Sequence, residues 1–405
     1  MLGAIYVGLA GMNAYSKGLD VISNNVANLN TTGFKAGVAR FGDVVYRNGG
    51  GATQGSAGTS ITGAGVRVDG EQQNFAQGEM RSTGNSYDAA LQGNGFFVLE
   101  RDGQRYYTRA GQFQIDKNGI LIESASGGQV MMSSDTQSAG KLQIDPFRVF
   151  PPRATSSVNL NGNLARTGTA QVDLSSLVVN DTTGTTQTLR VRFTRDDTNP
   201  LLWTVDVTNP TDPTNKVLGT GKLLFNDDGT PSADNTPITV TVTPDKLPAF
   251  TFTLNVGTSG SYSGLTSLLS NSNSLVQLSH QDGLALGTMG PVNFDEHGNL
   301  EITYSNGEKK KIGRLVLARF DSNEDLKTVG NGLYITQQGR EPQLSGGLEL
   351  GLGSVVGGSL ELSNVDLTGQ FTDLIIIQRG YQASSQMTSV ANEMMQQLLS
   401  MQDRR

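Results

Sequence analysis

The chain has 405 residues, enough for two or three domains, and its formal net charge of −7 argues against a nucleic acid or an anionic membrane surface as a partner. It contains no cysteine, which excludes disulfide scaffolds, thiol nucleophiles and cysteine-ligated metal centres. With 51 glycines and only 6% aromatic residues, the composition is typical of short strands joined by tight turns and predicts a mainly β protein.

The first regular pattern, in residues 2–28, predicts a helix. Ile5, Met12 and Leu19 recur every seven residues, and a second apolar stripe lies beside them. Lys17 and Asp20 are the only charged residues among the first thirty, too few for a helix with a solvated outer face. The segment lacks the basic start of a secretory signal, and no run of 18 apolar residues occurs, so neither a cleavable signal nor membrane insertion is expected.

Residues 31–70 are expected to form a linker or an extended loop. The asparagines of residues 24–28 suit the end of the preceding helix, and Gly33 suits a turn with positive φ. The segment 47–65 is rich in glycine and has almost no apolar content, which is typical of a mobile connection.

The β-rich remainder divides where the proline content changes. Residues 1–145 contain no proline, whereas ten of the twelve prolines lie between Pro146 and Pro248. We therefore predict one β domain built from 71–145 and 286–365, with 146–285 inserted into it as a second β domain. In the insertion, apolar and polar residues alternate, as in half-buried antiparallel strands, over 189–193, 203–207, 238–242 and 250–256.

A second helix is predicted over residues 366–405. Apolar and small residues step by three or four along one face, and Asp366 or Ser363 supplies the N-cap. The predicted fold is mixed and mainly β: α-helical, coiled-coil-like segments from 1–30 and 366–405, with nested all-β domains of antiparallel strands, of sandwich or barrel type.

No catalytic, cofactor-binding or metal-binding site is predicted. Asp321, Asn323 and Asp325 match the first positions of a calcium loop, but Leu326 replaces its glycine and Gly332 replaces its closing glutamate. A solvated turn is the better interpretation.

Other chemical candidates also have simpler structural interpretations. Asp227 and Asp228 lie between strands in a turn context and are interpreted as turn formers. His280 and His297 lie outside any ligand spacing, and the glycine-rich segment 346–358 lacks the lysine and hydroxyl of a phosphate loop. An enzymatic function therefore has no support in the sequence.

Three sets of motifs resemble the bacterial flagellar axial proteins, the proteins of the rod and hook. Residues 19–35, LDVISNNVANLNTTGFK, are similar to the family's N-terminal signature. The segments NGFFVL (94–99) and YTRAGQFQIDKNGIL (107–121) resemble its core-domain strands. Its closing helix signature is matched by LELSNVDL (360–367) and IIIQRGYQASSQ (375–386). Because the motifs lie at both ends and between them, they are specific together.

This resemblance implies a structural protein that assembles with itself. Terminal helices would form the inner tube of a helical homopolymer, 71–145 with 286–365 its middle layer, and 146–285 its outer surface. The family signature and the apolar helix positions are then expected to form the seam between subunits: Ile5, Leu9, Met12, Leu19, Asp20, Ile22, Asn24, Asn25, Ala27, Asn28, Gly33, Phe34, Lys35, Leu367, Phe371, Leu374, Ile377, Tyr381, Met395 and Leu398.

Within the family, two features favour a hook-type member. Residues 280–322 resemble the segment with which hook-type members re-enter the shared core. The chain also carries the insertion 146–285, whereas distal rod members resemble the shared core with little else. We therefore expect a curved, flexible tube that acts as a universal joint for torque, rather than the stiff shaft of a distal rod-type protein. A secreted β-rich adhesin is less favoured, because the insertion offers a single tryptophan, Trp203, and no evident ligand face.

The resemblance also implies partners and a destination. The partners would be further copies of the chain, the hook cap and hook–filament junction proteins, the distal rod and the flagellar type III export apparatus. The expected place is the flagellum at the extracellular surface, reached without a cleavable signal peptide. No nucleic acid, membrane insertion or cofactor is expected.

Overall fold

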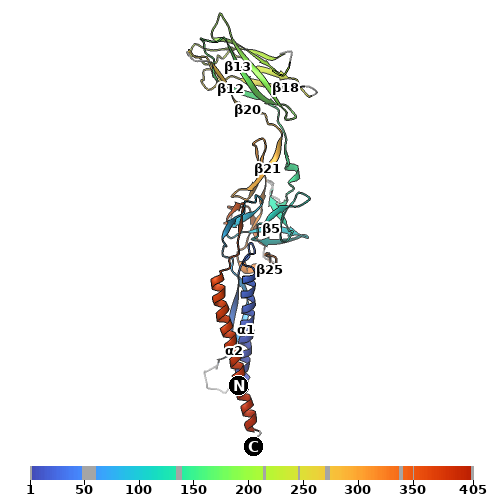
Figure 1. The fold of residues 1–405 in the computed structure, drawn as a ribbon, viewed down its shortest axis with the longest axis vertical. Helices are drawn as coiled ribbons and strands as arrows, with labels where there is room; N and C mark the ends of the chain where they lie inside the picture. Colours follow the sequence, from blue (N-terminus) through green and yellow to red (C-terminus); the bar gives the residue numbers. More distant parts are fainter. Residues whose placement is uncertain are drawn as a thin grey trace, which may run out of the picture. The chain divides into compact units, whose positions relative to one another are not determined.

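The computed structural model of the chain describes residues 2–47, 61–133, 139–212, 216–244, 247–269, 274–336, 341–349 and 351–402. They form two compact units (Figure 1). The first contains Met1–Asp145, Pro291–Ile302 and Lys310–Arg405, and the second contains Pro146–Gly290 and Thr303–Lys309. The described residues are mainly β with two helices, α1 (Leu2–Ala27) and α2 (Leu367–Gln402), which confirms the coarse fold class.

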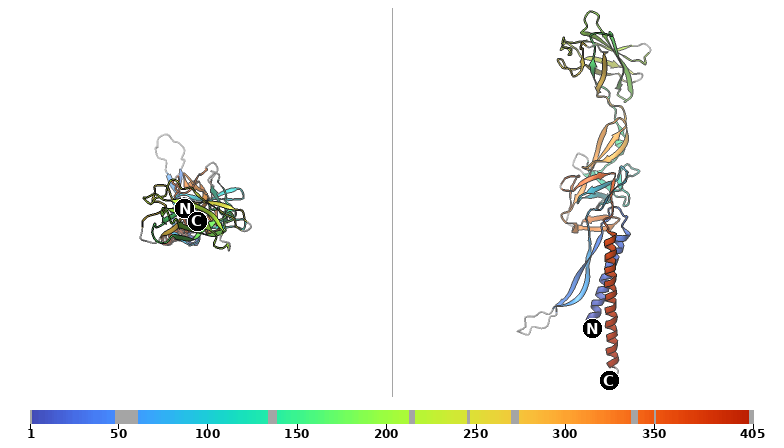
Figure 2. Two further views of the ribbon diagram at one scale, coloured as in Figure 1. Left: turned by 90° about the horizontal axis from the view of Figure 1, so that it is seen from above. Right: turned by 60° about the vertical axis from the view of Figure 1, so that its left-hand side comes forward.

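Both helices lie in the first unit, side by side and antiparallel (Figures 1 and 2). At the start of α2, the Asp366 carboxylate accepts a hydrogen bond from the Thr368 backbone N–H at 3.0 Å, so Asp366 is the N-cap. At the end of α1, the Asn28 side chain donates to the Asn24 carbonyl at 2.9 Å. The same carbonyl also accepts the Asn28 backbone N–H at 3.1 Å, so both bonds tie Asn28 to the last turn of α1.

Residues 31–70 are not the loop that the composition suggested. They contain most of an antiparallel hairpin of β1 (Gly37–Arg47) and β2 (Ile61–Gln73), with bulges after Arg40 and Asp43. Paired strands satisfy each other's backbone groups, so the hairpin forms although glycine dilutes its apolar pattern. The centre of the expected mobile segment, 48–60, lies outside the described residues.

The remaining strands of the first unit surround a core rich in aromatic side chains. Phe96 packs edge-on against Phe75, Phe320 and Tyr334. Strand β5 pairs with β6, β9 and β24, and two short ladders, β3–β29 and β4–β28, bring early and late segments of the chain together. The strands are β3 (Met80–Ser82), β4 (Ala89–Gln92), β5 (Phe96–Arg101), β6 (Gln104–Thr108), β7 (Phe113–Ile115), β8 (Leu121–Glu123), β9 (Gln129–Ser133), β10 (Ala139–Lys141), β24 (Leu317–Arg319), β25 (Leu326–Gly330), β26 (Leu333–Thr336), β27 (Gln343–Ser345), β28 (Ser354–Gly357) and β29 (Ser359–Glu361).

The second unit has its own core, to which two sheets contribute. One sheet has the order β13-β14-β15-β16 and the other β17-β18-β12-β19, with β20 also paired to β12. Every second residue of β15 is buried, among them Trp203 and Val205, which confirms the alternation expected there. The strands are β11 (Val149–Phe150), β12 (Ser157–Asn163), β13 (Gln171–Asn180), β14 (Thr186–Arg195), β15 (Leu202–Thr208), β16 (Val217–Leu224), β17 (Ile238–Val242), β18 (Phe250–Asn255), β19 (Leu265–Thr266) and β20 (Leu275–Gln281).

Two details of the strand prediction need correction. β12 pairs with β18 and β19 in parallel, so the insertion is not wholly antiparallel. The sheet orders in the described residues do not close into a barrel. Of the four passages of the chain between the two units, three lie in strands β21 (Gly287–Phe294), β22 (Asn299–Tyr304) and β23 (Lys309–Leu315). The fourth lies in the 3₁₀ turn at Asp145–Phe147, and a second 3₁₀ turn lies at Asn323–Asp325.

Candidate functional site

The two ends of the chain meet where the terminal helices join the strands of the first unit. Gly33, six residues after α1, has φ +68°, and its backbone N–H donates to the Glu361 carbonyl at 2.8 Å. A Cβ at Gly33 would lie 2.6 Å from the Ala110 nitrogen, so only glycine fits both the backbone angle and the space. The N-terminal signature therefore packs directly on the segment before α2.

Three buried charges hold this junction, which we call the clasp: Lys35, Arg109 and Glu361. The Lys35 Nζ donates to Glu361 Oε1 at 2.6 Å and to the Ala76 carbonyl at 2.9 Å. Arg109 Nη1 lies 3.5 Å from Glu361 Oε2, and its Nη2 donates to the Gly93 carbonyl at 2.6 Å. All three side chains are at most 1% exposed, so water screens their charges little.

Burial dominates the protonation chemistry of the clasp. It lowers the pKa of Lys35, against the opposing effect of Glu361. Burial also lowers the pKa of Arg109, and it raises the pKa of the neighbouring Tyr334 to about 12. Because the hydrogen bonds of these buried groups join segments that are far apart in the sequence, the clasp fixes the path of the chain.

Asparagine side chains connect the helices to the clasp. Asn25, almost fully buried, donates to the Gly37 carbonyl and accepts from the Gly37 N–H, both at 2.8 Å. The same amide donates to Gln370 Oε1 on α2 at 2.8 Å. Asn364 Oδ1 accepts from the Ala36 N–H at 2.8 Å. One amide thus bridges α1, the start of β1 and α2.

The contact between α1 and α2 is made by small residues. A Cβ added to Gly8 would lie 2.4 Å from Thr388 Oγ1, and one added to Gly11 would lie 2.6 Å from Ser384 Oγ. At Gly18 it would meet Ile377, and at Gly380 of α2 it would meet the Tyr15 ring. The backbones therefore approach closely at positions where the chain has no side chain.

This contact differs from the expected apolar heptad. The structure buries Ile22, Asn25, Gly33, Lys35 and Ile377 among the expected seam residues. It leaves half-buried Ile5, Met12, Leu19, Asn28, Phe34, Leu374 and Met395, and exposed Leu9, Asp20, Asn24, Ala27, Leu367, Phe371, Tyr381 and Leu398. Their place in a seam between subunits stays a prediction.

Sequence reasoning missed the glycine face of α1 and two members of the clasp. The spacing of Gly8 and Gly11, with Gly18 two turns later, was a usable signal for close helix contact. Arg109 directly follows β6 and Glu361 ends β29, within the motifs 107–121 and 360–367, but these motifs contain several other polar residues and no local pattern marks either charge as buried.

The described residues contain no group of three or more His, Asp or Glu side chains placed to share a metal ion. Neither α1 nor α2, the helices of the described part of the chain, combines the length and apolar character that a bilayer span requires.

Comparison with known proteins gives this arrangement a family. The model described as "Flagella basal body rod protein" matches residues 5–35, and "Flagellar basal body rod FlgEFG protein C-terminal" matches 356–401. A third, "Flagellar hook protein FlgE/F/G D1 domain", matches 90–172 and so runs past the unit border at Asp145. These matches define the chain as an axial protein of the bacterial flagellum.

Relatives that align along the whole chain narrow the class. The flagellar hook protein FlgE of Treponema pallidum (strain Nichols) is 30% identical over 463 aligned residues, covering 99% of this chain and all of that protein. The flagellar hook protein FlgE of Borreliella burgdorferi is 28% identical over 439, covering 98% and 99%. The crystal structure of Helicobacter pylori flagellar hook protein FlgE2 has 12% identity and a TM-score of 0.45 over 68% of this chain and 98% of that one, a likeness too distant to argue from.

The chain belongs to the flagellar hook protein family.

Proposed function

We propose that copies of this chain pack their terminal helices side by side to form the wall of the hook tube. As a member of the hook protein family, the chain is a structural subunit of the bacterial flagellar hook, which is a polymer. The observation that carries the packing scheme is the exposure of large apolar side chains along both helices: Tyr6, Val7, Leu9, Phe371, Ile375, Ile376, Tyr381, Met387, Val390, Met394, Leu398, Leu399 and Met401.

Such exposure is unfavourable in a single copy and favourable in an assembly. Soluble proteins seldom leave a long apolar face in water, and such faces mark interaction surfaces. The strand cores of the two units, by contrast, bury their large side chains almost completely. Contacts that repeat head to tail without closing a ring produce a helical tube.

The proposed tube is layered, and its function is mechanical. The terminal helices form the inner layer, 71–145 with 286–365 the middle layer, and 146–285 the outer layer. Bending makes subunits slide against each other as the tube turns, and polar β surfaces exchange weak contacts more easily than an interlocked apolar core does. The tube then acts as a universal joint that transmits torque.

The proposed partners follow from this position in the flagellum. Besides further copies of the chain, the proposed partners are the distal rod, the hook cap and the hook–filament junction proteins. The subunit reaches this place through the flagellar type III export apparatus without a cleavable signal. The family is structural, and the proposal includes no catalytic step.

The stiff distal rod shaft is the less favoured alternative. The relatives that align over the whole chain are hook proteins, whereas the family models at the two ends are shared with rod proteins. Electron microscopy separates the alternatives, because a hook-type subunit is expected to form curved tubes and a rod-type subunit straight ones.

The packing scheme is tested by one charge placed on an exposed apolar position of α2 and one placed outside the terminal helices. Ile375→Asp puts a carboxylate on an exposed apolar position and should prevent tube formation while the unfolding of both units stays unchanged. Val217→Asp, at an exposed apolar position of β16 in the second unit, is the matched control and should leave tube formation intact. Normal tubes from Ile375→Asp would refute the proposal.

A further inference from the structure

Six asparagines of the chain are followed directly by glycine, and the structure describes five of these pairs. In such a pair the glycine nitrogen can attack the carbonyl carbon of the asparagine side chain, because a residue without a Cβ leaves its own N–H open to approach. The dipeptide is the same in every pair, so the structure around each attacking nitrogen decides which pair can react. The described pairs are Asn94–Gly95, Asn118–Gly119, Asn161–Gly162, Asn306–Gly307 and Asn331–Gly332.

In four of these pairs, a hydrogen bond to a backbone carbonyl holds the attacking N–H. In two of the four the asparagine side chain is held as well, because Asn118 Nδ2 donates to Asp116 Oδ2 and Asn306 Nδ2 donates to the Ala285 carbonyl, both at 3.0 Å. Each of these bonds must break before the ring that leads to reaction can close. The carbonyls that accept from the glycine nitrogens are Leu352 for Gly95, Asp116 for Gly119, Gly264 for Gly162 and Tyr304 for Gly307, at 3.0, 3.0, 3.3 and 2.9 Å.

The fifth pair lacks this protection. Asn331–Gly332 is the two-residue turn between β25 and β26, since Gly330 is paired with Leu333. The two residues have φ +53° and +67°, as in a type I′ turn. Within the described part of the chain, neither the Gly332 N–H nor the Asn331 side chain forms a hydrogen bond, and Asn331 is exposed.

The turn can also open at little cost. β25 ends the described strand order of its sheet, and its residues Lys327–Gly330 are exposed. Segments with few buried contacts and exposed backbone bonds open locally at a small fraction of the free energy of global unfolding. The Asn331 side chain can therefore reach the neighbouring nitrogen while the strand core stays folded.

We propose that Asn331 is a site of spontaneous deamidation in the folded protein. The Gly332 nitrogen bonds to the Asn331 Cγ, the Cγ–Nδ2 bond breaks, and ammonia leaves with the proton of the Gly332 N–H. Water then opens the resulting succinimide ring at either of its two carbonyl carbons and gives aspartate or isoaspartate. The net reaction converts an amide and one water molecule into a carboxylate and an ammonium ion.

The isoaspartate product should disturb a contact next to the clasp. The Gly332 carbonyl accepts a hydrogen bond from Thr108 Oγ1 at 2.9 Å, and Thr108 directly precedes Arg109. In isoaspartate the main chain runs through the side chain and is one atom longer, so a two-residue turn can no longer keep Gly330 opposite Leu333. We expect the bond from Thr108 to be lost with this pairing.

Peptide mapping of the folded full-length chain tests the site. The protein is incubated in mildly alkaline water enriched in heavy oxygen, which labels every product formed during the incubation, and is then digested with trypsin for mass spectrometry. The tryptic peptide of residues 328–340 contains Asn331 and no other asparagine. Asn331 should convert at least about tenfold faster than the asparagine of each of the other four pairs, equivalent to about 1.4 kcal/mol. Equal or slower conversion would overturn the proposal.

The chain unfolded in guanidinium chloride is the control for effects of sequence. There the five pairs should convert at similar rates, because every attacking nitrogen is free. If Asn331 led by the same factor in the unfolded chain, its neighbours in the sequence would be the cause and the proposal would fail. The reaction needs no second copy, so these results do not depend on tube formation.

A variant tests the effect on the turn. Asn331→Gly removes the reacting amide and keeps the turn, since glycine adopts a positive φ without strain. After the same incubation, amide hydrogen exchange in β25 and β26 should have risen with the isoaspartate content of the chain that carries Asn331, and should be unchanged in Asn331→Gly. Equal exchange in both proteins would overturn the expected loss of the Thr108 contact.

Discussion

The clasp should respond strongly to loss of its carboxylate. Glu361→Gln keeps the shape of the side chain and an oxygen for the Gly78 N–H, which donates to Glu361 Oε1 at 2.9 Å. It removes the negative charge and leaves Lys35 and Arg109 as two buried cations. Breaking a buried pair in this way costs about 3–5 kcal/mol, a large fraction of the 5–15 kcal/mol that stabilises a typical domain.

Two local probes make the loss measurable. The only tryptophan, Trp203, is buried in the core of the second unit, so its fluorescence reports that unit alone during urea denaturation. Amide hydrogen exchange in β3 and β29, which flank the clasp, reports the first unit. We expect early unfolding of the first unit in Glu361→Gln and an unchanged Trp203 transition.

A double substitution identifies the cause. In the double variant Lys35→Met with Glu361→Gln, one of the two uncompensated cations is gone. Its loss of unfolding free energy should therefore be about 2 kcal/mol smaller than the sum of the losses in the two single variants. If Glu361→Gln lowers the free energy of unfolding by less than about 1 kcal/mol, the charges are solvated. If the losses of the two single variants add up to the loss of the double variant, the charges do not interact.

Three further predictions concern the same unit and the inserted domain. Burial raises the pKa of Tyr334 from 10.0 to about 12. The contribution of its neutral form to the free energy of unfolding is therefore complete below pH 10 and is lost as the pH rises toward 12. In Tyr334→Phe, the stability of the first unit should not fall in this pH range for this reason, as unfolding titrations measure. Gly33 has φ +68°, and an added Cβ would lie 2.6 Å from a backbone atom, whereas Gly103 has φ +77° and open space around it. Gly33→Ala should therefore destabilise the first unit by more than the about 1–2 kcal/mol expected for Gly103→Ala. Urea denaturation followed by hydrogen exchange measures both losses. Replacing 146–285 with a short linker should leave assembly intact but give straighter tubes in electron micrographs and reduced swimming at normal hook length; failure to assemble would show that residues beyond Pro146 belong to the shared core.

Local patterns predicted much of the fold because their causes are local. The alternation over 203–207 reflects one buried face of β15, and the N-cap at Asp366 follows from an oxygen side chain before an apolar run. The clasp could not be predicted in the same way. Lys35 and Glu361 are 326 positions apart, and only the folded chain shows that both lose their water at one point.

The hairpin and the glycine face were missed for a different reason. A search for apolar periodicity detects apolar side chains. At Gly8 and Gly11 the helices approach closely because glycine has no side chain, so this contact leaves no mark in the apolar pattern. In the hairpin, strand pairing is carried by backbone hydrogen bonds, and glycines at positions such as Gly63 and Gly70 weaken the apolar signal of β2 without preventing its pairing.

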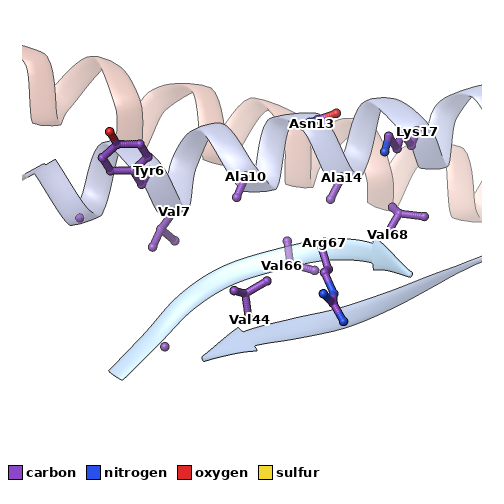
Figure 3. Close-up of a pocket in the computed structure, with 12 residues that line it drawn as sticks. Tyr6, Val7, Ala10, Asn13, Ala14, Lys17, Val44, Val66, Arg67 and Val68 are labelled. Carbon is purple, nitrogen blue, oxygen red and sulfur yellow. The ribbon is translucent and has the colours of Figure 1, made fainter. Parts of the chain in front are cut away.

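The places where local reasoning failed lie beside the surfaces for which we propose a second copy. In a natural protein, segments that break local rules tend to be those with a further role. The hairpin presents Val44 and Val66 to a groove along α1 instead of burying them in a core (Figure 3). Helix α1 uses glycine against α2, so its larger side chains Val7 and Leu9 remain exposed. A single chain gains little from either arrangement. Both become favourable once a neighbouring helix supplies the apolar surface that one copy lacks, because the same side chains then leave water without any change in the fold.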